Sequence, residues 1–444
     1  MHVNWQTRQT VARNLAAALL AGEWTLDRLT DSAVAFLGPR RHKSCRRLII
    51  EILARERAYP PSPSDLAAQL ANCGSFYMAA RPFLEAPRLM RPPLASPVFA
   101  PSAALAGLEI PRLATSGELA DWLGLSIEHL DWIAGTRRPH DPTMIPVLQH
   151  YAYVFVPKKF GPPRLIESPK PRLKTMQRRI LDEILAPVPQ HPSVHGFVKG
   201  SSALTGAHLH AGADIVIAAD LADFFPSTPL RRVHGLFRSL GYPWAVARAL
   251  VGLVSTATPE AVFLRRPRHE QHAATTRKLY ASRHLPQGAP TSPALANLAA
   301  WPLDRRLDGL VRTLGATYTR YADDIVFSGD ATFARHAYRV LATLGRIAGE
   351  EGYTLNAKKT RLSRAHQRQT VTGIVVNAHM NIARDDYDRL KAILHNCVRY
   401  GPATQNHEGV ADFRAHLDGR VGWVTQVNPH RGRKLRRTFD AIRW

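Results

Sequence analysis

Apolar residues recur every three or four positions in the first part of the chain, for example in TVARNLAAALLAGEW and KSCRRLIIEILARERA. This spacing places them along one side of a helix. The stretch PPSPSD breaks the pattern and supplies a new helix start. We therefore predict a small helical region over residues 1–85. From 86 to 112, prolines interrupt the helical period and favour extended backbone, which predicts a linker.

The stretch TSGELADWLGLSIEHLDWIAG predicts two short helices. Thr115 and Glu118 have the spacing of a capping box, Ser126 is suited to a second N-cap, and Gly124 separates the two helices. The pair resembles a helix-turn-helix in outline. Packing is favoured over base reading, because the second helix has no cluster of Arg, Asn or Gln. The expected core positions are Leu125, Ile127, Leu130 and Ile133.

The middle of the chain alternates strand-like and helix-like segments. YAYVFVPKKFGPPRLIESP predicts a hairpin that turns near residues 160–163, and RLKTMQRRILDEILAPV predicts a helix. DIVIAADL predicts a strand that ends at Asp220. ATYTRY and IVFSG predict a second hairpin, with Asp323 and Asp324 at its tip. From about Arg361, a further strand is expected before helices rich in arginine.

The composition is that of a soluble globular protein, with 444 residues and 45% hydrophobic content. A chain of this length accommodates about two to four domains. No run of about 18 apolar residues occurs, and the N-terminus lacks the apolar region of a signal peptide. We therefore predict a cytoplasmic protein with no membrane partner. The three cysteines are far apart and cannot by themselves form a disulfide framework or a zinc site.

The charge is strongly positive: 59 Lys and Arg face 35 Asp and Glu, for a formal net charge of +24. Such a field attracts polyanions and raises the rate at which they are encountered. Nucleic acid is therefore the first partner to consider. The alternative is a genome-wide arginine bias, in which the charges only form a solvated surface.

Two adjacent carboxylates, Asp323 and Asp324, repel each other unless a cation offsets their charge. If the sheet brings Asp220 beside them, oxygen ligands with vacant positions suit Mg²⁺. Two such ions about 4 Å apart stabilise both the attacking and the leaving oxygen in phosphoryl transfer. An isolated Asp-Asp is most often a simple turn. Here the loop LPQGAPTSP, with Gln287 and Gly288, lies between Asp220 and the pair and runs into a helix expected to start near Ser292. A simple turn does not account for this ordered set.

Four stretches together resemble the motifs of the reverse transcriptase family. They are AADLADFFPS, LPQGAPTSP, YADD and LNAKKT, and the likeness covers roughly residues 145–444. Within the family, VHGFVKGSSALTGAHLH, VTGIVVN and DGRVGWVTQVNPHRGRKLRR resemble segments of the bacterial retron-type enzymes. One position departs from the retron pattern Asn-Ala-x-x-His: Gly206 stands in place of the asparagine, in a run that ends at His210.

The resemblance implies an α+β right-hand polymerase. We expect fingers over 113–215, a palm with a four-stranded antiparallel sheet and supporting helices over 216–360, and a helical thumb over 361–444. The helical region 1–85 and the proline-rich linker 86–112 precede them.

The resemblance also implies roles for individual residues. Asp220, Asp323 and Asp324 would hold two Mg²⁺ ions, for which Mn²⁺ can substitute. Lys359, or else Lys358, would protonate the pyrophosphate leaving group, with a surface salt bridge as the rival interpretation.

Further residues would bind the incoming dNTP. Arg164, with Lys158 or Lys159, would bind its triphosphate, unless these residues only form a solvated basic hairpin. Asp223 and Phe225 would contact the nucleotide, and Phe225 would stack under its sugar and exclude a 2′-hydroxyl. If the strand continues, Phe224 points the other way and is buried. Gln287 and Gly288 would contact nucleotide and template.

A third set of residues would bind RNA or the RNA–DNA duplex. His195 would position template or primer, with a structural role as the alternative, and a basic and aromatic group in the thumb would grip the duplex backbone. The complete set is His195, Thr372, Gly373, Trp423, Arg431, Arg433, Lys434, Arg436 and Arg437.

The activity implied is RNA-templated DNA synthesis. A retron-type enzyme would use a structured non-coding RNA as template, start on a 2′-hydroxyl of that RNA, and leave a branched RNA–DNA product. Such systems are associated with defence against phage and with a separate effector protein. One alternative is a group II intron-like or other defence-associated reverse transcriptase. Another is a non-catalytic nucleic-acid-binding protein on a polymerase scaffold, which the intact Asp220, Asp323 and Lys359 disfavour.

Overall fold

The computed structural model describes residues 5–20, 24–55, 61, 63–85, 97–135, 149–158, 162–264 and 272–444. The chain forms two compact units. The first comprises Met1–Pro189 with Phe225–Ala299, and the second comprises Gln190–Phe224 with Ala300–Trp444. Among the residues so described, no helix combines the length and the apolar character needed to cross a bilayer.

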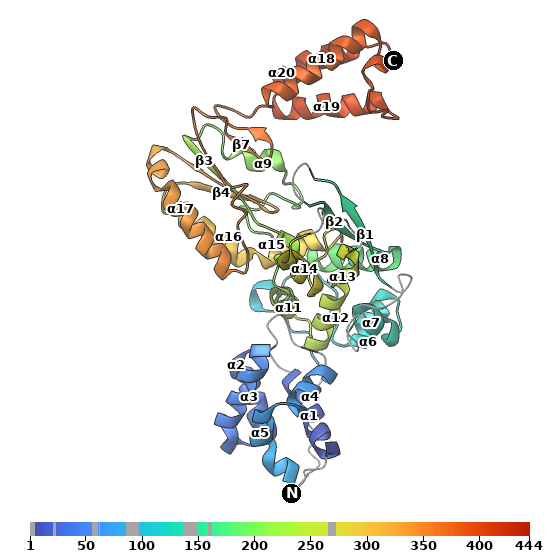
Figure 1. The fold of residues 1–444 in the computed structure, drawn as a ribbon, viewed down its shortest axis with the longest axis vertical. Helices are drawn as coiled ribbons and strands as arrows, with labels where there is room; N and C mark the ends of the chain where they lie inside the picture. The colour runs from blue at the N-terminus through green and yellow to red at the C-terminus, as the bar shows by residue number, and fades with distance from the viewer. Residues whose placement is uncertain are drawn as a thin grey trace. The chain divides into compact units, whose positions relative to one another are not determined.

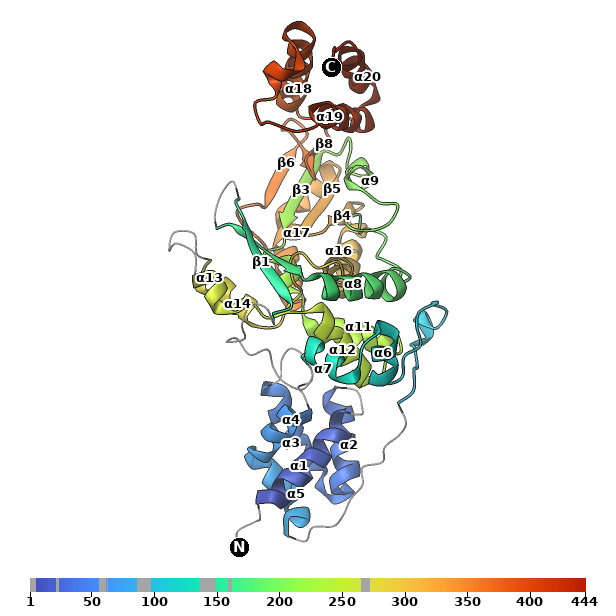
Figure 2. The same cartoon turned by 90° about the vertical axis from the view of Figure 1, so that its right-hand side faces the viewer.

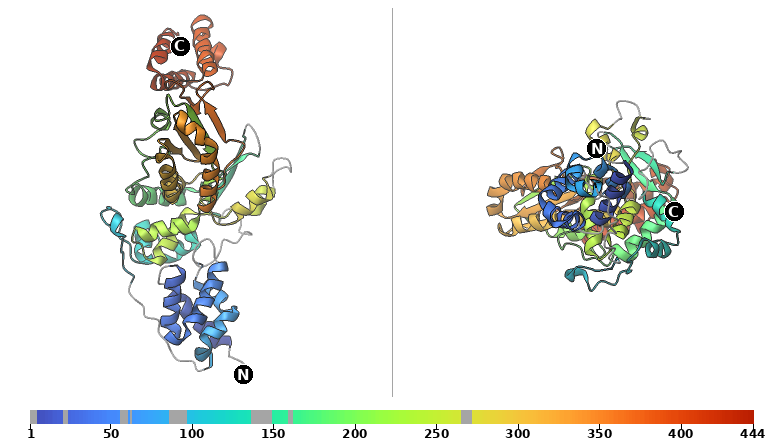
Figure 3. Two further views of the ribbon diagram at one scale, coloured as in Figure 1. Left: turned by 90° about the vertical axis from the view of Figure 1, so that its left-hand side faces the viewer. Right: turned by 90° about the horizontal axis from the view of Figure 1, so that it is seen from below.

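The predicted N-terminal helical region is confirmed as a bundle of five helices, coloured blue in Figure 3. Leu15, Leu48 and Phe76 are fully buried in its core, and Trp244 of a later helix belongs to the same hydrophobic cluster. The N-terminal helices therefore share their core with that later helix. Their bounds are α1 Trp5–Leu20, α2 Leu26–Leu37, α3 His42–Arg55, α4 Pro63–Ala71 and α5 Gly74–Glu85.

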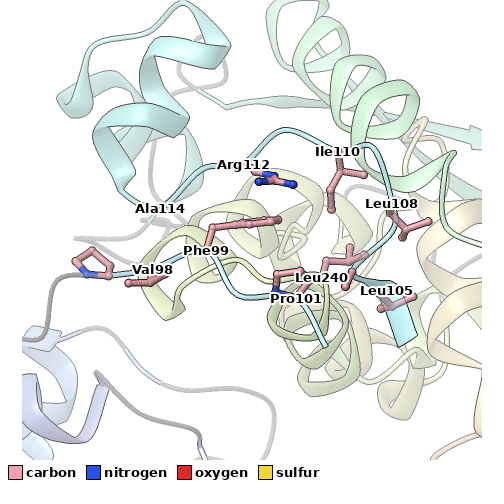
Figure 4. Close-up of a pocket in the computed structure, with 11 residues that line it drawn as sticks. Val98, Phe99, Pro101, Leu105, Leu108, Ile110, Arg112, Ala114 and Leu240 are labelled. Carbon is pink, nitrogen blue, oxygen red and sulfur yellow. The ribbon is translucent and has the colours of Figure 1, made fainter. Parts of the chain in front are cut away.

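The second half of the proline-rich segment lies against helix α11 (Leu230–Ser239) and the turn that follows it. Ala100 N–H donates to the Gly241 carbonyl at 2.9 Å, and Tyr242 O–H donates to the Pro111 carbonyl at 2.9 Å. Phe99 and its neighbours line an apolar pocket of about 390 Å³ there (Figure 4). Residues 97–112 of the predicted linker are thus packed against the helix and turn, while residues 86–96 lie outside the described part of the chain.

The two capped helices are α6 (Ser116–Leu123) and α7 (Ile127–Ala134). Thr115 Oγ1 accepts from Glu118 N–H and Ser126 Oγ accepts from His129 N–H, as the spacing predicts. Three of the four expected core residues are buried. Ile127 was predicted wrongly: as the first helical residue after the cap, it is 44% exposed.

The rest of the first unit contains the predicted hairpin, β1 (Tyr151–Val156) paired antiparallel with β2 (Arg164–Pro169). Helix α8 (Pro171–Arg179) follows and runs into a π-helical turn at Ile180–Leu185. The loop LPQGAPTSP ends in a helix that begins at Ser292, as predicted. The remaining helices of this unit are α12 Trp244–Val254, α13 Glu260–Leu264, α14 Ala274–Ala281 and α15 Ser292–Ala299.

The second unit is built on the predicted four-stranded antiparallel sheet, in the order β4-β5-β3-β6. Figure 2 shows β3 between β5 and β6. The sheet extends beyond the palm boundary expected at residue 360, because β6 pairs with β3. The strands are β3 Ile215–Asp220, β4 Thr317–Tyr321, β5 Asp324–Gly329 and β6 Arg361–Arg364.

Helices α16 (Trp301–Arg312) and α17 (Ala331–Glu350) cover one face of this sheet (Figure 1). Helix α9 (Ala203–His208) and the hairpin of β7 (Thr370–Val371) and β8 (Ile374–Val375) contribute to a cluster with Val216 and Val326. Val216 and Val326 alternate along their strands with Ile217 and Phe327. The two valines therefore point to the face of the sheet opposite to that of Ile217 and Phe327.

The C-terminal helices α18 (Arg384–Tyr400), α19 (Phe413–Val427) and α20 (Pro429–Asp440) enclose a small core of their own. An antiparallel sheet with supporting helices, a helical N-terminal region and C-terminal helices confirm the expected α+β class.

Candidate active site

The sheet brings the three aspartates of the sequence motifs to one edge. Asp220 is the last residue of β3, and Asp324, the first of β5, is its cross-strand partner. Asp323 lies in the turn between β4 and β5, and its carbonyl accepts from Leu221 N–H at 2.9 Å. Residues from distant parts of the chain therefore converge as their strand positions predict.

The convergence is electrostatically costly in the absence of a cation. Burial raises the pKa of Asp323, and the Asp220 charge and a hydrogen bond with Asp220 raise it further. Burial and the charges of Asp323 and Asp220 raise the pKa of Asp324 to about 6. Carboxylates whose pKa values are raised by burial and by neighbouring like charges are typical of sites that bind a cation.

Lys359 supplies one positive charge to this cluster. Its Nζ donates to Asp220 Oδ2 at 2.7 Å. A turn places it there, because Asn356 N–H donates to the Asp220 carbonyl at 2.7 Å and the Lys359 N–H donates to the Asn356 carbonyl at 3.0 Å. Desolvation acts to lower the pKa of Lys359, but the bond to Asp220 and the charges of Asp220, Asp323 and Asp324 together outweigh it, so the pKa is raised. Lys359 thus forms an ion pair, as the alternative interpretation of a surface salt bridge predicts. Its partner is Asp220, one of the clustered aspartates.

The donor set suits a hard divalent cation. Asp220 and Asp323 offer carboxylate oxygens and no nitrogen or sulfur, and oxygen ligands are those that Mg²⁺ prefers. Within the described ranges, no group of three or more His, Cys, Asp or Glu is arranged to hold a metal ion. The fit therefore rests on two close carboxylates, not on a preformed trio.

The loop that contains HGF packs against the turn of the YADD motif. His195 N–H donates to the Arg320 carbonyl at 2.9 Å, and the His195 Nδ1 is 2.9 Å from Thr205 Oγ1. A Cβ at Gly206 would lie 3.3 Å from the His195 ring. The departure from the retron pattern thus coincides with close packing of His195, which here makes structural contacts.

His210, the histidine of that pattern, joins the two strands of the turn. Its ring nitrogens lie 2.6 Å from Ser328 Oγ and 2.7 Å from Thr319 Oγ1, on β5 and β4 respectively. The side chain is 1% exposed, and burial, with the nearby His195, lowers its pKa to about 4. His210 is therefore a neutral brace of the hairpin. No role was predicted for it from the sequence.

The residues predicted to bind the dNTP are divided between the two units. Arg164 and Lys158 are exposed at the turn end of the β1–β2 hairpin in the first unit, and Lys159 lies outside the described residues. Asp223, in the second unit, is exposed with a positive φ of 47°. The strand predicted over Phe224 and Phe225 is wrong, because both lie in a short helix, α10 (Phe224–Ser227). Phe224 is nonetheless buried, and Phe225 is half-buried.

Gln287 and Gly288 lie against β2 in the first unit. Glu167 N–H donates to the Gln287 carbonyl at 2.8 Å. Gly288 has φ +137°, and a Cβ there would be 2.9 Å from the Glu167 carbonyl oxygen. Only glycine permits this approach. The Glu167 carboxylate is itself fully buried and bonded to His284 Nε2 at 2.9 Å and Thr258 Oγ1 at 2.5 Å, a support that the sequence analysis missed.

A pocket of about 680 Å³ lies on the sheet face of the second unit. Asp324 and Tyr321 line it, as do the predicted Thr372 and Gly373 in the turn between β7 and β8. Thr372 has φ +47°, and its buried hydroxyl has no hydrogen-bond partner among the described residues. Arg361 and Arg368, which the sequence analysis did not single out, add positive charge. Polar, basic and open to Asp324, the pocket suits a polyanion.

The basic residues of the C-terminal helices differ in their contacts. Arg436 donates to Asp418 Oδ1 at 2.5 Å, and the Arg431 guanidinium stacks 4.7 Å from the centre of the Tyr387 ring. Arg433, Lys434 and Arg437 are exposed on α20, and Trp423 on α19 is 42% exposed. The exposed residues are those best able to reach a nucleic-acid backbone.

Comparisons with known proteins agree on one family. The family model for reverse transcriptase (RNA-dependent DNA polymerase) matches residues 156–376. The Retron Mx65 reverse transcriptase of Myxococcus xanthus is 40% identical over 335 residues, covering 76% of this chain and 73% of that protein. The Retron Mx162 reverse transcriptase of the same organism is 38% identical over 337 residues, with 72% and 66% covered. The Retron Ec86 reverse transcriptase of Escherichia coli is 33% identical over 286 residues, with 64% and 78% covered.

Proposed function

Because the chain belongs to the retron-type reverse transcriptases and is thus an RNA-directed DNA polymerase, we propose that it copies a dedicated, structured non-coding RNA. A 2′-hydroxyl of that RNA starts the DNA chain, and the product is a branched RNA–DNA molecule. The observation that carries the proposal is the 40% identity to a retron enzyme over 335 residues. Those residues include most of the polymerase region.

At the sheet edge, Asp220 and Asp323, with Asp324 beside them, would hold two divalent cations. These would be Mg²⁺, with Mn²⁺ as a substitute, and when bound they would stabilise the charge on the attacking and leaving oxygens. Lys359 is protonated at neutral pH, because its ordinary pKa of 10.5 is raised further by the neighbouring aspartates. Its Nζ donates a proton to the pyrophosphate as that group leaves.

The residues that bind the dNTP are those that the family resemblance implies. Arg164 and Lys158 hold the triphosphate, for which the fork of a guanidinium is suited. Gln287 contacts the nucleotide from a loop that Glu167 and Gly288 fix against β2. Asp223 and Phe225 contact the nucleotide, and the Phe225 ring stacks under the sugar and excludes a 2′-hydroxyl.

The RNA and the growing duplex are bound by the pocket of the second unit and by the C-terminal helices. Thr372 supports this role, because its buried hydroxyl lacks a partner in the described chain and an RNA oxygen can provide one. Arg361 and Arg368 in the same pocket contact phosphates. On α20, Arg433, Lys434 and Arg437 grip the duplex backbone, and Trp423 stacks on an exposed base or sugar.

The deciding experiment is to purify the protein from its native host with bound nucleic acid and to digest that material with RNase. A retron-type enzyme leaves DNA with a residual ribonucleotide branch, which a 2′,5′-debranching enzyme removes. Linear DNA without a branch would contradict the retron function and leave the polymerase activity intact. Absence of any DNA in both the wild-type and the Asp323→Asn preparations would favour a non-catalytic binding protein.

A role in phage defence, acting with a separate effector protein, follows from the retron proposal. It is tested by plating phage on cells that carry the locus with wild-type protein or Asp323→Asn. Protection lost in the variant supports the role. Equal plaque numbers with and without the locus, over a broad phage panel, would contradict it.

A further inference from the structure

We propose that Arg320, held in place by Asp304, is a positioning residue that sets the conformation of the turn carrying Asp323. Arg320 is on β4 and Asp304 on α16, and both side chains are fully buried. Arg320 Nε donates to Asp304 Oδ1 and its Nη2 donates to Asp304 Oδ2, each at 2.7 Å. This two-point pairing fixes the plane of the guanidinium.

The remaining terminal nitrogen of Arg320 reaches the turn itself. Its Nη1 donates to the Ala322 carbonyl at 2.9 Å. Ala322 precedes Asp323 and has φ +56°, a left-handed conformation that costs a residue with a Cβ roughly 1 kcal/mol or more. A strained residue beside a reacting group persists only when its surroundings hold it. Arg320 is one of the groups that hold it.

A second contact holds the turn at the backbone nitrogen of Ala322. A Cβ at Gly196 would lie 2.6 Å from the Ala322 nitrogen, so the backbone of residue 196 is in direct contact with the turn. His195 N–H donates to the Arg320 carbonyl. Ala322 therefore has the guanidinium on its carbonyl side and residue 196 on its nitrogen side.

Arg320 also touches the segment that carries the other carboxylate. Its guanidinium carbon is 5.3 Å from the centre of the Phe224 ring. Phe224 follows Asp223 and lies in the segment just after Asp220. One buried cation thus contacts both segments from which Asp220 and Asp323 project, and fixes the spacing between them.

Stability alone is a weak reason for this arrangement. Replacing a buried ion pair by apolar residues of similar volume is often neutral or stabilising, because the charges no longer have to be desolvated. The Asp304 carboxylate accepts a further hydrogen bond, from Tyr318 O–H to its Oδ1 at 2.6 Å. Three polar groups are thus buried together beside the turn, and the geometry of the turn is what they determine.

The test separates positioning from folding. In the triple variant Arg320→Met, Asp304→Leu and Tyr318→Phe, the whole polar group becomes apolar and no buried charge is left unpaired. Arg320→Lys is the second variant: it keeps the charge but cannot pair twice with Asp304 and also reach Ala322. Single-turnover dNTP incorporation is measured on an ordinary primed RNA template. The outcome then depends only on the polymerase activity and not on the retron RNA proposed above.

We expect the triple variant to keep its unfolding midpoint and its affinity for the primed template. Its maximal incorporation rate should fall at least tenfold, while its apparent dNTP affinity changes by less than threefold. Arg320→Lys should show the same split. The control, Arg306→Gln, removes the ion pairs that Arg306 of the same helix, α16, makes with Glu350 and Glu351, and should leave the rate unchanged.

A triple variant that folds and incorporates dNTP within twofold of the wild-type rate would overturn the proposal. If the triple variant does not fold, Arg320→Lys decides. A folded Arg320→Lys with an unchanged maximal rate overturns the proposal, and a reduced rate at unchanged dNTP affinity supports it.

Discussion

Lys359 Nζ donates to Asp220 Oδ2 across 2.7 Å, although the two residues are 139 positions apart in the chain. The acidic edge of the sheet therefore carries an internal counter-charge. In the absence of a divalent ion, this lysine partly offsets the repulsion among three carboxylates.

The first prediction concerns Asp323. Asp323→Asn removes a charge and a ligand oxygen at nearly constant volume. We expect dNTP incorporation to fall below detection while RNA binding stays within about twofold of wild type. Primer extension and filter binding measure the two. Asp386→Asn, at an exposed carboxylate on α18, is the matched control. Extension by Asp323→Asn at the wild-type rate would refute its assignment to the site.

The second prediction distinguishes a proton donor from an ion-pair partner at Lys359. Lys359→Met should slow incorporation by about 10²-fold, the lower range for general acid catalysis. Lys359→Arg keeps a cation beside Asp220 but cannot give up its proton, so it should stay slow. Lys358→Met, which changes the exposed neighbouring lysine, should be near normal. Recovery of the full rate in Lys359→Arg would identify the ion pair as the function.

The third prediction concerns stability and pH. The folded pKa of His210 is about 4, below its ordinary value of 6.5, so the unfolded state binds more protons between these values. The free energy of unfolding should therefore fall as the pH drops from about 6.5 to 4, by on the order of 3 kcal/mol for His210. Buried His234 shifts in the same direction and adds to the trend.

Denaturant unfolding at several pH values measures this effect. His210→Gln keeps a polar bridge without a group that titrates in the window, so its stability should depend less on pH than that of wild type. His210→Gln with an unchanged pH slope would show that His210 does not titrate as its burial implies.

The fourth prediction concerns duplex binding by α20. Changing Arg433, Lys434 and Arg437 to glutamine should make RNA–DNA binding less dependent on salt. The log–log slope should decrease by roughly one unit for each phosphate that these side chains no longer neutralise. Arg436→Gln should reduce it less, because Arg436 is already paired with Asp418. Titrations at four salt concentrations measure the slopes. Equal slopes for wild type and the triple variant would remove α20 from the interface.

Features that depend on local sequence were predicted well. The caps at Thr115 and Ser126, the end of β3 at Asp220 and the helix start at Ser292 follow from side chains within a few residues of each site. The convergence of Asp220 with Asp323 and Asp324 could also be anticipated, because strand ends and a hairpin tip restrict where side chains project.

Features that depend on distant partners could not be predicted in this way. The hydrophobic pattern around Arg320 and Asp304 is equally compatible with charged residues at the surface. The two side chains become buried only when α16 packs on β4. An arginine inside the strand TYTRY was the available signal. Phe224 and Phe225 were assigned to a strand because two residues cannot distinguish a period of 2 from one of 3.6. The strand ends before these two residues. Leu221 N–H, just beyond the end of β3, donates to the Asp323 carbonyl, and helix α10 begins at Phe224.

Trp244 gives the N-terminal helices a practical importance for handling this protein. Since its indole completes the core formed by α1 to α5, an expression fragment trimmed to the polymerase motifs would present that ring, and the apolar side of α12, to solvent. Such a fragment should aggregate even with every residue of the polymerase site intact. A shortened enzyme would therefore need a polar replacement at position 244, or the bundle would have to be retained.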